Sequence, residues 1–294
     1  MKLILGTAQL GLDYGISNQA GAMPLQMAHK ILNTAHNAGI TTLDTAPHYG
    51  NAEARIGQFH QKSPFTFKVI SKAPRFDDHD QISAQQLATL ESQIKKSLSE
   101  LSISEIDTLL VHALEDLQKP GGMKLWQHLK NHPQLKKTGV SIYTAEDIDW
   151  VLEHLNPDVI QAPFNVLDQR LLKSGHLKAL KQRGIETHAR SVFLQGLLLM
   201  SPEQIRARHP KALESVSQFL TFGQKSKQDP LNAALHFVLQ QPLIDQVLVG
   251  VQSAAELTTL CDIAQDQPKQ NWLATDWDQF YCQDPEIIDP RYWS

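Results

Sequence analysis

The segment Thr42-Leu-Asp-Thr-Ala-Pro-His-Tyr-Gly-Asn51 places a carboxylate and a phenol directly after a short apolar run. The run, from Ile40 to Leu43, is of the length and composition that favour a buried strand. Asp44 and Tyr49 then follow the carboxyl end of that strand. The carboxyl ends of parallel strands are where α/β folds gather functional groups, so this segment predicts part of a site.

Two further strands end in the same way. Phe65 to Ser71 predicts a strand that is followed by Lys72, and Ile106 to Val111 predicts one that is followed by His112. Four polar side chains at the tips of three successive strands indicate one shared site at the mouth of a barrel. Each residue alone has an ordinary structural explanation, such as a turn, a packed ring or a surface charge. Their conjunction favours the shared site.

The whole chain alternates between strand-like and helix-like segments. Strands are predicted at 3–6, 40–43, 65–71, 106–111, 138–142, 159–162, 185–189 and 246–249, and helices at 25–37, 52–59, 83–101, 124–130, 145–155, 168–183, 202–221, 230–240 and 254–263. Short apolar strands alternating with helices predict a parallel sheet that is buried on both faces. We therefore expect an α/β fold, a closed (β/α)8 TIM barrel. A doubly wound open sheet is the competing architecture, but its Gly-x-Gly-x-x-Gly turn is absent.

The domain organisation follows from this repeat. No linker divides the chain, so residues 1–294 are expected to form a single barrel domain. Residues 266–294 lie outside the repeat and are expected to pack on the barrel as a C-terminal tail, because large aromatic side chains are rarely left in solvent. These side chains are Trp272, Trp277, Tyr281, Tyr292 and Trp293.

Composition excludes several classes of partner. The 294 residues include 27 basic and 31 acidic side chains, a net charge of −4, and no basic run that would indicate nucleic-acid binding. No apolar segment is long enough to span a membrane, and the N-terminus lacks a signal-peptide pattern. With only Cys261 and Cys282, the natural interpretation is a cytoplasmic protein with reduced thiols. The sequence does not define an oligomeric state, and a monomer is the default expectation.

A metal site is not expected. His128 and His132 are four residues apart on a predicted helix, a spacing that permits a shared metal. No third ligand accompanies them, so we predict a solvent-facing pair instead.

The four strand-end residues also carry a resemblance, because the chain resembles the aldo-keto reductases over nearly its whole length. Asp44-Thr-Ala-Pro-His-Tyr-Gly-Asn-Ala-Glu53 is similar to the family's Asp-x-x-x-x-Tyr-Gly segment, and Lys72 and His112 match its lysine and histidine. Segments 139–141, 161–165, 190–197 and 250–253 are similar to the family's cofactor-binding segments. The resemblance implies NADPH or NADH as cofactor, bound by Ser141, Gln161, Arg190, Ser191, Phe193, Gln195, Gly196, Leu197, Gly250, Gln252 and Ser253.

The chemistry of carbonyl reduction requires such a set of residues. Hydride transfer to a carbonyl leaves an alkoxide that must gain a proton, and Tyr49 is the expected donor. A phenol with a pKa near ~10 donates reluctantly at neutral pH, but an adjacent ammonium such as Lys72 lowers that pKa. Asp44 would keep Lys72 charged, and His112 would orient the carbonyl oxygen. No metal is required for this reaction.

The sequence departs from the family in the cofactor region. NADP-preferring members generally place basic residues after the eighth strand, whereas residues 251–259 contain none and include Glu256. Both NAD and NADP therefore stay open as cofactors. Arg190 stands where many members have an aromatic ring against the nicotinamide, and a guanidinium can also stack on a ring. Ile142 replaces a common amide side chain and leaves Ser141 as the carboxamide contact.

Two rival functions stay open. The first is a nicotinamide-binding redox sensor or regulatory barrel with negligible turnover. The second is an unrelated barrel hydrolase or isomerase, because the fold alone does not define the function. The expected partner is a small-molecule carbonyl compound. The 11–15 turn and the closing Asp289-Pro-Arg-Tyr-Trp293 are similar to bacterial reductases of sugar and surface-polysaccharide metabolism.

Overall fold

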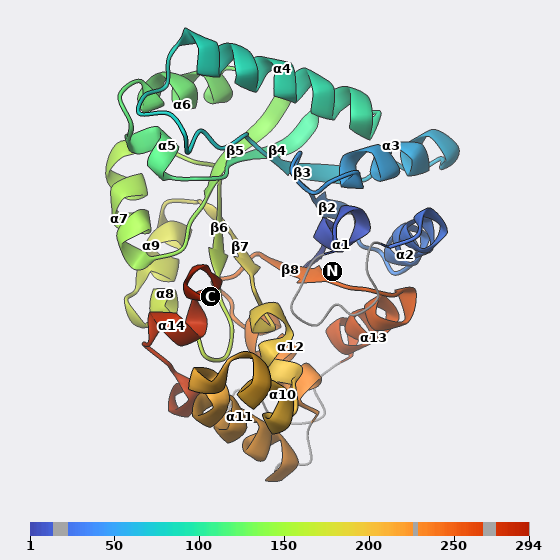
Figure 1. Cartoon of the computed structure of the whole chain (residues 1–294), viewed down its shortest axis with the longest axis vertical. Helices are drawn as coiled ribbons and strands as arrows, with labels where there is room; N and C mark the ends of the chain where they lie inside the picture. Colours follow the sequence, from blue (N-terminus) through green and yellow to red (C-terminus); the bar gives the residue numbers. More distant parts are fainter. Residues whose placement is uncertain (14–22, 226–228, 267–274, 294) are drawn as a thin grey trace.

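The computed structural model describes residues 1–13, 23–225, 229–266 and 275–293, and its strands form a closed parallel barrel in chain order. Each strand pairs with the next one along the chain, and β8 pairs with β1. Figure 1 shows the helices arranged around these strands. The expected (β/α)8 TIM barrel is therefore confirmed. The strands are β1 Leu3–Gly6, β2 Thr42–Asp44, β3 Lys68–Lys72, β4 Ile106–Val111, β5 Leu135–Ser141, β6 Val159–Pro163, β7 Glu186–Arg190 and β8 Gln246–Gly250.

The helices between the strands follow the predicted segments, with additional short helices in the loops. They are α1 Ala8–Gly11, α2 Leu25–Asn37, α3 Ala52–Lys62, α4 Ala84–Leu101, α5 Glu115–Gln118, α6 Gly122–Lys130, α7 Ala145–His154, α8 Arg170–Lys173, α9 His176–Gln182, α10 Pro202–Arg208, α11 Leu213–Lys225, α12 Pro230–Leu239, α13 Ala254–Gln265 and α14 Pro285–Ile288. Four 3-10 helices are described: η1 Leu194–Leu199, η2 Pro210–Ala212, η4 Trp277–Phe280 and η5 Pro290–Tyr292.

Local sequence explains where several helices begin and end. Ser83 starts α4 with a capping box, in which its hydroxyl and the Gln86 side chain each satisfy a free backbone N–H. The predicted helix over 168–183 is wrong as a single unit. It is broken into α8 and α9 at Gly175, which has a left-handed φ of 82°. The predicted helix over 202–221 is likewise broken at His209, because Pro210 cannot continue the hydrogen-bonding pattern of α10.

The barrel lumen is built in layers, because side chains alternate in direction along each strand. An apolar layer of buried side chains, with the partly buried Leu248 against it, fills the middle of the lumen: Ile4, Ile70, Leu110, Val159 and Leu248. Two residues further along the same strands come Gly6, Lys72, His112, Gln161 and Gly250. The same alternation that buries the apolar layer therefore turns the polar residues into the mouth of the barrel. Asp44 joins them because it pairs in register with Gly6 and Ile70.

The described part of the C-terminal tail contacts several barrel elements. The Trp277 ring lies 5.2 Å from the ring of Phe237 in α12, measured between centroids. The backbone N–H of Cys282 donates to the carbonyl of Leu167 at 3.0 Å. The Arg291 guanidinium lies 3.7 Å from the centroid of the Tyr143 ring, beside the barrel mouth. Trp272, which was expected to pack with the tail, lies outside the described residues, and so do positions 14 and 15 of the 11–15 turn.

Two smaller expectations concern the membrane and the thiols. Among the described residues, no helix combines the length and apolar character needed to cross a membrane. Cys261 is buried, Cys282 is half-buried, and both are free thiols.

Candidate active site

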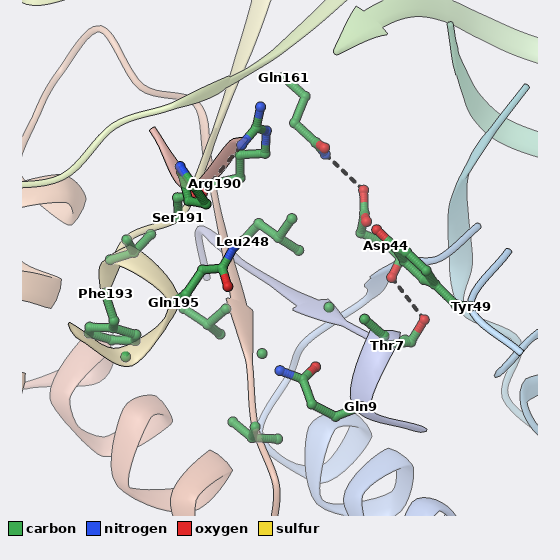
Figure 2. Close-up of a pocket in the computed structure, with 18 of the residues that line it drawn as sticks. Thr7, Gln9, Asp44, Tyr49, Gln161, Arg190, Ser191, Phe193, Gln195 and Leu248 are labelled. Carbon is green, nitrogen blue, oxygen red and sulfur yellow. Dashed lines mark hydrogen bonds between the residues drawn. The ribbon is translucent and has the colours of Figure 1, made fainter. Parts of the chain in front are cut away.

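A cavity of about 730 Å³ opens at the carboxyl ends of the barrel strands. Every strand contributes to its wall: β4 through His112, which follows the strand, β6 through Gln161, two residues before its end, and the others through their last residue. Figure 2 shows the polar side chains that converge on this space from opposite sides of the barrel. Volumes of this size hold small molecules and cofactors in proteins, so the cavity is the candidate active site.

A buried ion pair lies on one wall of the cavity. The Lys72 Nζ lies 2.6 Å from the Asp44 Oδ1, and the two side chains are only 3% and 2% exposed. The second oxygen, Asp44 Oδ2, accepts a hydrogen bond from the Gln161 amide at 2.8 Å (Figure 2). Lys72 also donates to the carbonyl oxygen of Thr45 at 3.1 Å. Both charges are thus fully engaged, as a buried pair must be.

Lys72 stays charged despite its burial. Burial alone would lower its pKa, but Asp44 and Tyr49, through charge and hydrogen bonding, raise the pKa of Lys72 above its usual value. The Lys72 Nζ lies 5.3 Å from the centroid of the Tyr49 ring. The ammonium is therefore close enough to stabilise a negative charge on the Tyr49 oxygen.

A tight turn after β2 positions Tyr49. The Tyr49 N–H donates to the carbonyl of Ala46 at 3.0 Å. Gly50 follows in the left-handed region, with φ of 57°, and a Cβ at that position would lie 2.3 Å from the carbonyl oxygen of Gly11. Only glycine fits such a position, so the Tyr-Gly sequence aims the phenol into the cavity.

His112 enters the cavity from the end of β4 and lies against a second imidazole. The rings of His48 and His112 are stacked, with centroids 4.6 Å apart. Burial first, and then the charges of His48, Lys72, Arg75 and Arg190, lower the pKa of His112 to about 3. The His112 ring is therefore neutral near pH 7 and can donate one hydrogen bond to a substrate oxygen.

The loop after β7 forms another wall and is strained. Its backbone holds four left-handed residues: Ser191 (φ 58°), Leu194 (48°), Gln195 (54°) and Gly196 (94°). Such conformations cost about 1–3 kcal/mol each for residues other than glycine and tend to persist where function requires them. Successive backbone N–H groups in such turns form concave anion-binding surfaces. This loop is therefore a candidate anion-binding wall of the cavity.

The start of α13 forms the remaining wall, and side chains of the same segment accept hydrogen bonds from its free backbone N–H groups. The Ser253 hydroxyl accepts from the Glu256 N–H at 3.1 Å. The Glu256 carboxylate accepts from the Gln252 N–H at 2.8 Å and lines the cavity. Helix α13 therefore presents a negative charge to the cavity.

The structure brings most of the predicted site residues together. All four strand-end residues line the cavity, and so do Ser141, Gln161, Arg190, Ser191, Phe193, Gln195, Gly196, Gly250 and Gln252. Leu197 is fully buried in the core, Ser253 caps α13, and neither is among the lining residues.

Several lining residues had not been predicted. His48 precedes Tyr49 in the same turn, which could have indicated its position. Gln9, Tyr143 and Arg291 carry no comparable sequence signal, because they reach the cavity from a short helix, a loop and the tail.

The His128 and His132 pair was expected to face solvent, and this expectation is wrong for His132, which is 8% exposed. Both Nε2 atoms contact the same oxygen of Glu91, at 3.3 Å and 3.2 Å. The His132 Nδ1 accepts from the Gln134 N–H, which leaves the proton on Nε2 to bond Glu91. Within the described part of the chain, no three potential ligands are arranged to hold a metal ion.

Comparisons with known proteins agree with this geometry. The model of the aldo/keto reductase family matches residues 2–271, and the chain belongs to this family. It is therefore an oxidoreductase that acts on small carbonyl compounds with a nicotinamide cofactor, as the resemblance implied.

The individual relatives are distant. D-threo-aldose 1-dehydrogenase of Pseudomonas sp is 26% identical, with 88% of this chain and 90% of the relative covered. NADH-specific methylglyoxal reductase of Escherichia coli is 26% identical, with 67% and 68% covered. The holo form of an aldo-keto reductase from Bacillus halodurans is similar in fold, with a TM-score of 0.74 at 18% identity over 95% and 91% of the chains.

Proposed function

We propose that this protein reduces small, oxygen-rich aldehydes to alcohols, with NADH as the preferred hydride donor and Tyr49 as the proton donor. The observation that carries the proposal is the buried Asp44–Lys72 ion pair beside Tyr49, opposite a neutral His112. This arrangement stabilises negative charge on the phenol oxygen and leaves an uncharged hydrogen-bond donor for the substrate.

The residues divide the reaction between them. A nicotinamide bound in the cavity supplies the hydride. His112 donates a hydrogen bond to the substrate carbonyl oxygen and positions it beside the Tyr49 hydroxyl. Tyr49 then gives its proton to the alkoxide oxygen, and the resulting phenolate is stabilised by Lys72 until a solvent proton replaces the one given. Asp44 holds the Lys72 ammonium in place through the 2.6 Å contact.

The cofactor would lie along the cavity walls formed by the ends of β5 and β6, the loop after β7 and the start of α13. Ser141 and Gln161 are hydrogen-bonding side chains beside the ion pair and would face the nicotinamide end. The left-handed loop from Ser191 to Gly196 would face the phosphates. Gly250 and Gln252 would face the adenosine end.

The preference for NADH is supported by Glu256. Its carboxylate lines the cavity at the start of α13, and residues 251–259 provide no cation to pair with a 2′-phosphate. A phosphate brought near an unpaired carboxylate is repelled, whereas the 2′-hydroxyl of NADH can donate a hydrogen bond to it.

The substrate class is supported by the polar cavity wall and by the names of the relatives. The His48 ring lines the cavity and contacts the ring of Tyr49, and an imidazole there suits carbonyl compounds with neighbouring hydroxyl or oxo groups. The related proteins are named for aldoses and for methylglyoxal, which are compounds of this kind.

Single-turnover oxidation of bound NADH by a panel of aldehydes tests this function. The Tyr49→Phe variant should lose about 10³-fold in rate while its affinity for NADH, measured by protein fluorescence, stays within about twofold. Full activity in Tyr49→Phe would show that another group is the proton donor. Tight NADH binding without turnover in the unmodified protein would instead indicate a sensor.

A further inference from the structure

Arg190 is a fixed cation in the wall of the active-site cavity. Its guanidinium donates to the carbonyl of Ile142 at 3.0 Å and to the Ser191 hydroxyl at 3.3 Å. The guanidinium carbon also lies 4.2 Å from the centroid of the Tyr143 ring. These three contacts hold the charge in one place without neutralising it, because none of the three partners is an anion.

The surrounding charges leave Arg190 uncompensated. Around Tyr143, Arg170 is paired with Asp168 through two hydrogen bonds of 2.8 Å, and Arg291 is paired with Asp289 at 2.6 Å. The charge of Arg190 reaches Asp168, but that carboxylate is already engaged by Arg170. Within the described ranges of the chain, Arg190 forms no ion pair. Of these three guanidiniums, Arg170 and Arg291 each contact a carboxylate, and Arg190 contacts none within the described residues.

This charge lies beside the reaction centre. The charge of Arg190 contributes, after burial and other cations, to the low pKa of His112. Figure 2 shows Arg190 between Gln161, which contacts Asp44, and the loop that begins at Ser191. A nicotinamide that reaches Tyr49 while its phosphates follow this loop must therefore pass close to the guanidinium.

The two redox forms of the cofactor differ in charge at this point. The oxidised ring is a pyridinium with one positive charge, whereas the reduced dihydropyridine ring is neutral. A nearby cation therefore repels the oxidised form selectively. The effect falls slowly with distance, and two unit charges about 10 Å apart at a protein surface still change an affinity by about tenfold.

We propose that Arg190 makes this cavity select the reduced nicotinamide over the oxidised one. This inference rests on the proposed function, since it requires a nicotinamide in this cavity. Such selection lets the protein bind NADH in the presence of excess NAD⁺ and release NAD⁺ after the hydride has been transferred. Arg190 is in this sense a specificity-determining residue for the redox state of the cofactor.

Binding measurements test the proposal without catalysis. Dissociation constants for NADH and NAD⁺ are measured by calorimetry in the unmodified protein and in the neutral variants Arg190→Gln and Arg190→Tyr. The ratio of the NAD⁺ constant to the NADH constant should fall by about tenfold in both neutral variants. In Arg190→Lys, which keeps the charge, the ratio should stay within about threefold of its original value.

The matched control is the double variant Asp289→Asn/Arg291→Gln. It removes the second guanidinium on Tyr143 together with its carboxylate, so the net charge of the cavity is unchanged. Its ratio should equal that of the unmodified protein.

The outcomes separate the two proposals. A ratio that is unchanged in both neutral variants overturns the role of Arg190 while leaving the proposed function intact. Failure of the unmodified protein to bind either nucleotide overturns both. Two neutral variants are used so that instability of one, detected by thermal unfolding, leaves the other to decide.

Discussion

The imidazole of His48 lies flat against the imidazole of His112, with ring centroids 4.6 Å apart and ring planes inclined by 20°. Burial, followed by the charges of Lys72 and Arg75, lowers the pKa of His48, and His112 is shifted further, to about 3. Protonating either ring therefore opposes protonation of the other. The pair keeps a neutral hydrogen-bond donor next to Tyr49 even in mildly acidic solution.

The first prediction concerns acid stability. A histidine whose pKa is lower in the folded than in the unfolded state takes up a proton on unfolding. Its contribution to the free energy of unfolding is therefore complete above pH 6.5 and is lost as the pH falls towards 3. The His48→Phe variant keeps a stacked ring that cannot titrate. The free energy of unfolding is measured in urea between roughly pH 4 and 7, the range over which the lowered histidine pKa acts. It should fall less steeply with acid in this variant. An unchanged slope would show that His48 titrates normally in the folded protein.

The second prediction separates stability from chemistry in the Asp44–Lys72 pair. Lys72→Met leaves the Asp44 carboxylate buried without its cation, which should cost about 3–5 kcal/mol in the free energy of unfolding. The double variant Asp44→Asn/Lys72→Met removes both charges and should recover most of that loss. Aldehyde reduction should be lost in both, because neither retains a cation beside Tyr49. Recovery of activity along with stability in the double variant would contradict the role given to Lys72.

The third prediction concerns cofactor choice. Glu256→Lys replaces the carboxylate at the start of α13 by a cation and should tighten NADPH binding by about tenfold or more. Glu256→Gln is the matched control, because it can still accept from the Gln252 N–H but carries no charge. It should give a smaller gain for NADPH and little change for NADH, both measured by fluorescence titration. Equal NADPH affinity in all three proteins would place the 2′-phosphate elsewhere.

The fourth prediction concerns Glu53, which is buried between α3, β3 and α4. Its two oxygens accept hydrogen bonds of 2.9 Å from Ser71 and Ser97. Burial raises the pKa of Glu53 even though the two serine hydroxyls oppose the shift. Stability is therefore lost as the pH rises through the folded-state pKa. Glu53→Gln should raise the melting temperature at pH 8 by about 2 °C or more and change it little near pH 4. A lower melting temperature at pH 8 would show that the charged carboxylate stabilises the fold.

Much of the barrel could be predicted from the sequence, because periodicity and end signals are local. The strands Leu3–Gly6 and Ile106–Val111 and the helix Leu25–Asn37 were predicted with the bounds that the structure has. The breaks at Gly175 and at His209 were missed, although glycine and proline stand there. In each case a continuous apolar pattern on both sides of the break outweighed the local signal.

The strand-end residues could be predicted for a related reason. In a parallel barrel, a residue at the carboxyl end of a strand lies at the mouth of the barrel. The position of Lys72 and His112 in the sequence is therefore enough to place them there. The contacts of Tyr143 could not be predicted, because Arg190 and Arg291 reach its ring from β7 and from the tail, more than forty residues away. Nor does sequence spacing show that Asp168 and Asp289 neutralise two of the nearby guanidiniums and leave the third. Those relationships depend on loop geometry.

The two-residue alternation that lines the lumen limits where this chain can change its length. Inserting one residue between Ile70 and Lys72 would turn the lysine outward, among the helices, and bring its neighbour into the mouth. Inserting two would restore its direction but move it about 7 Å along the barrel axis, out of reach of Asp44. Insertions and deletions are therefore tolerated in the loops and the tail, which shape the substrate space, and not in the strands. New substrate ranges can arise by changes in loop length while the proton-donating group stays as it is.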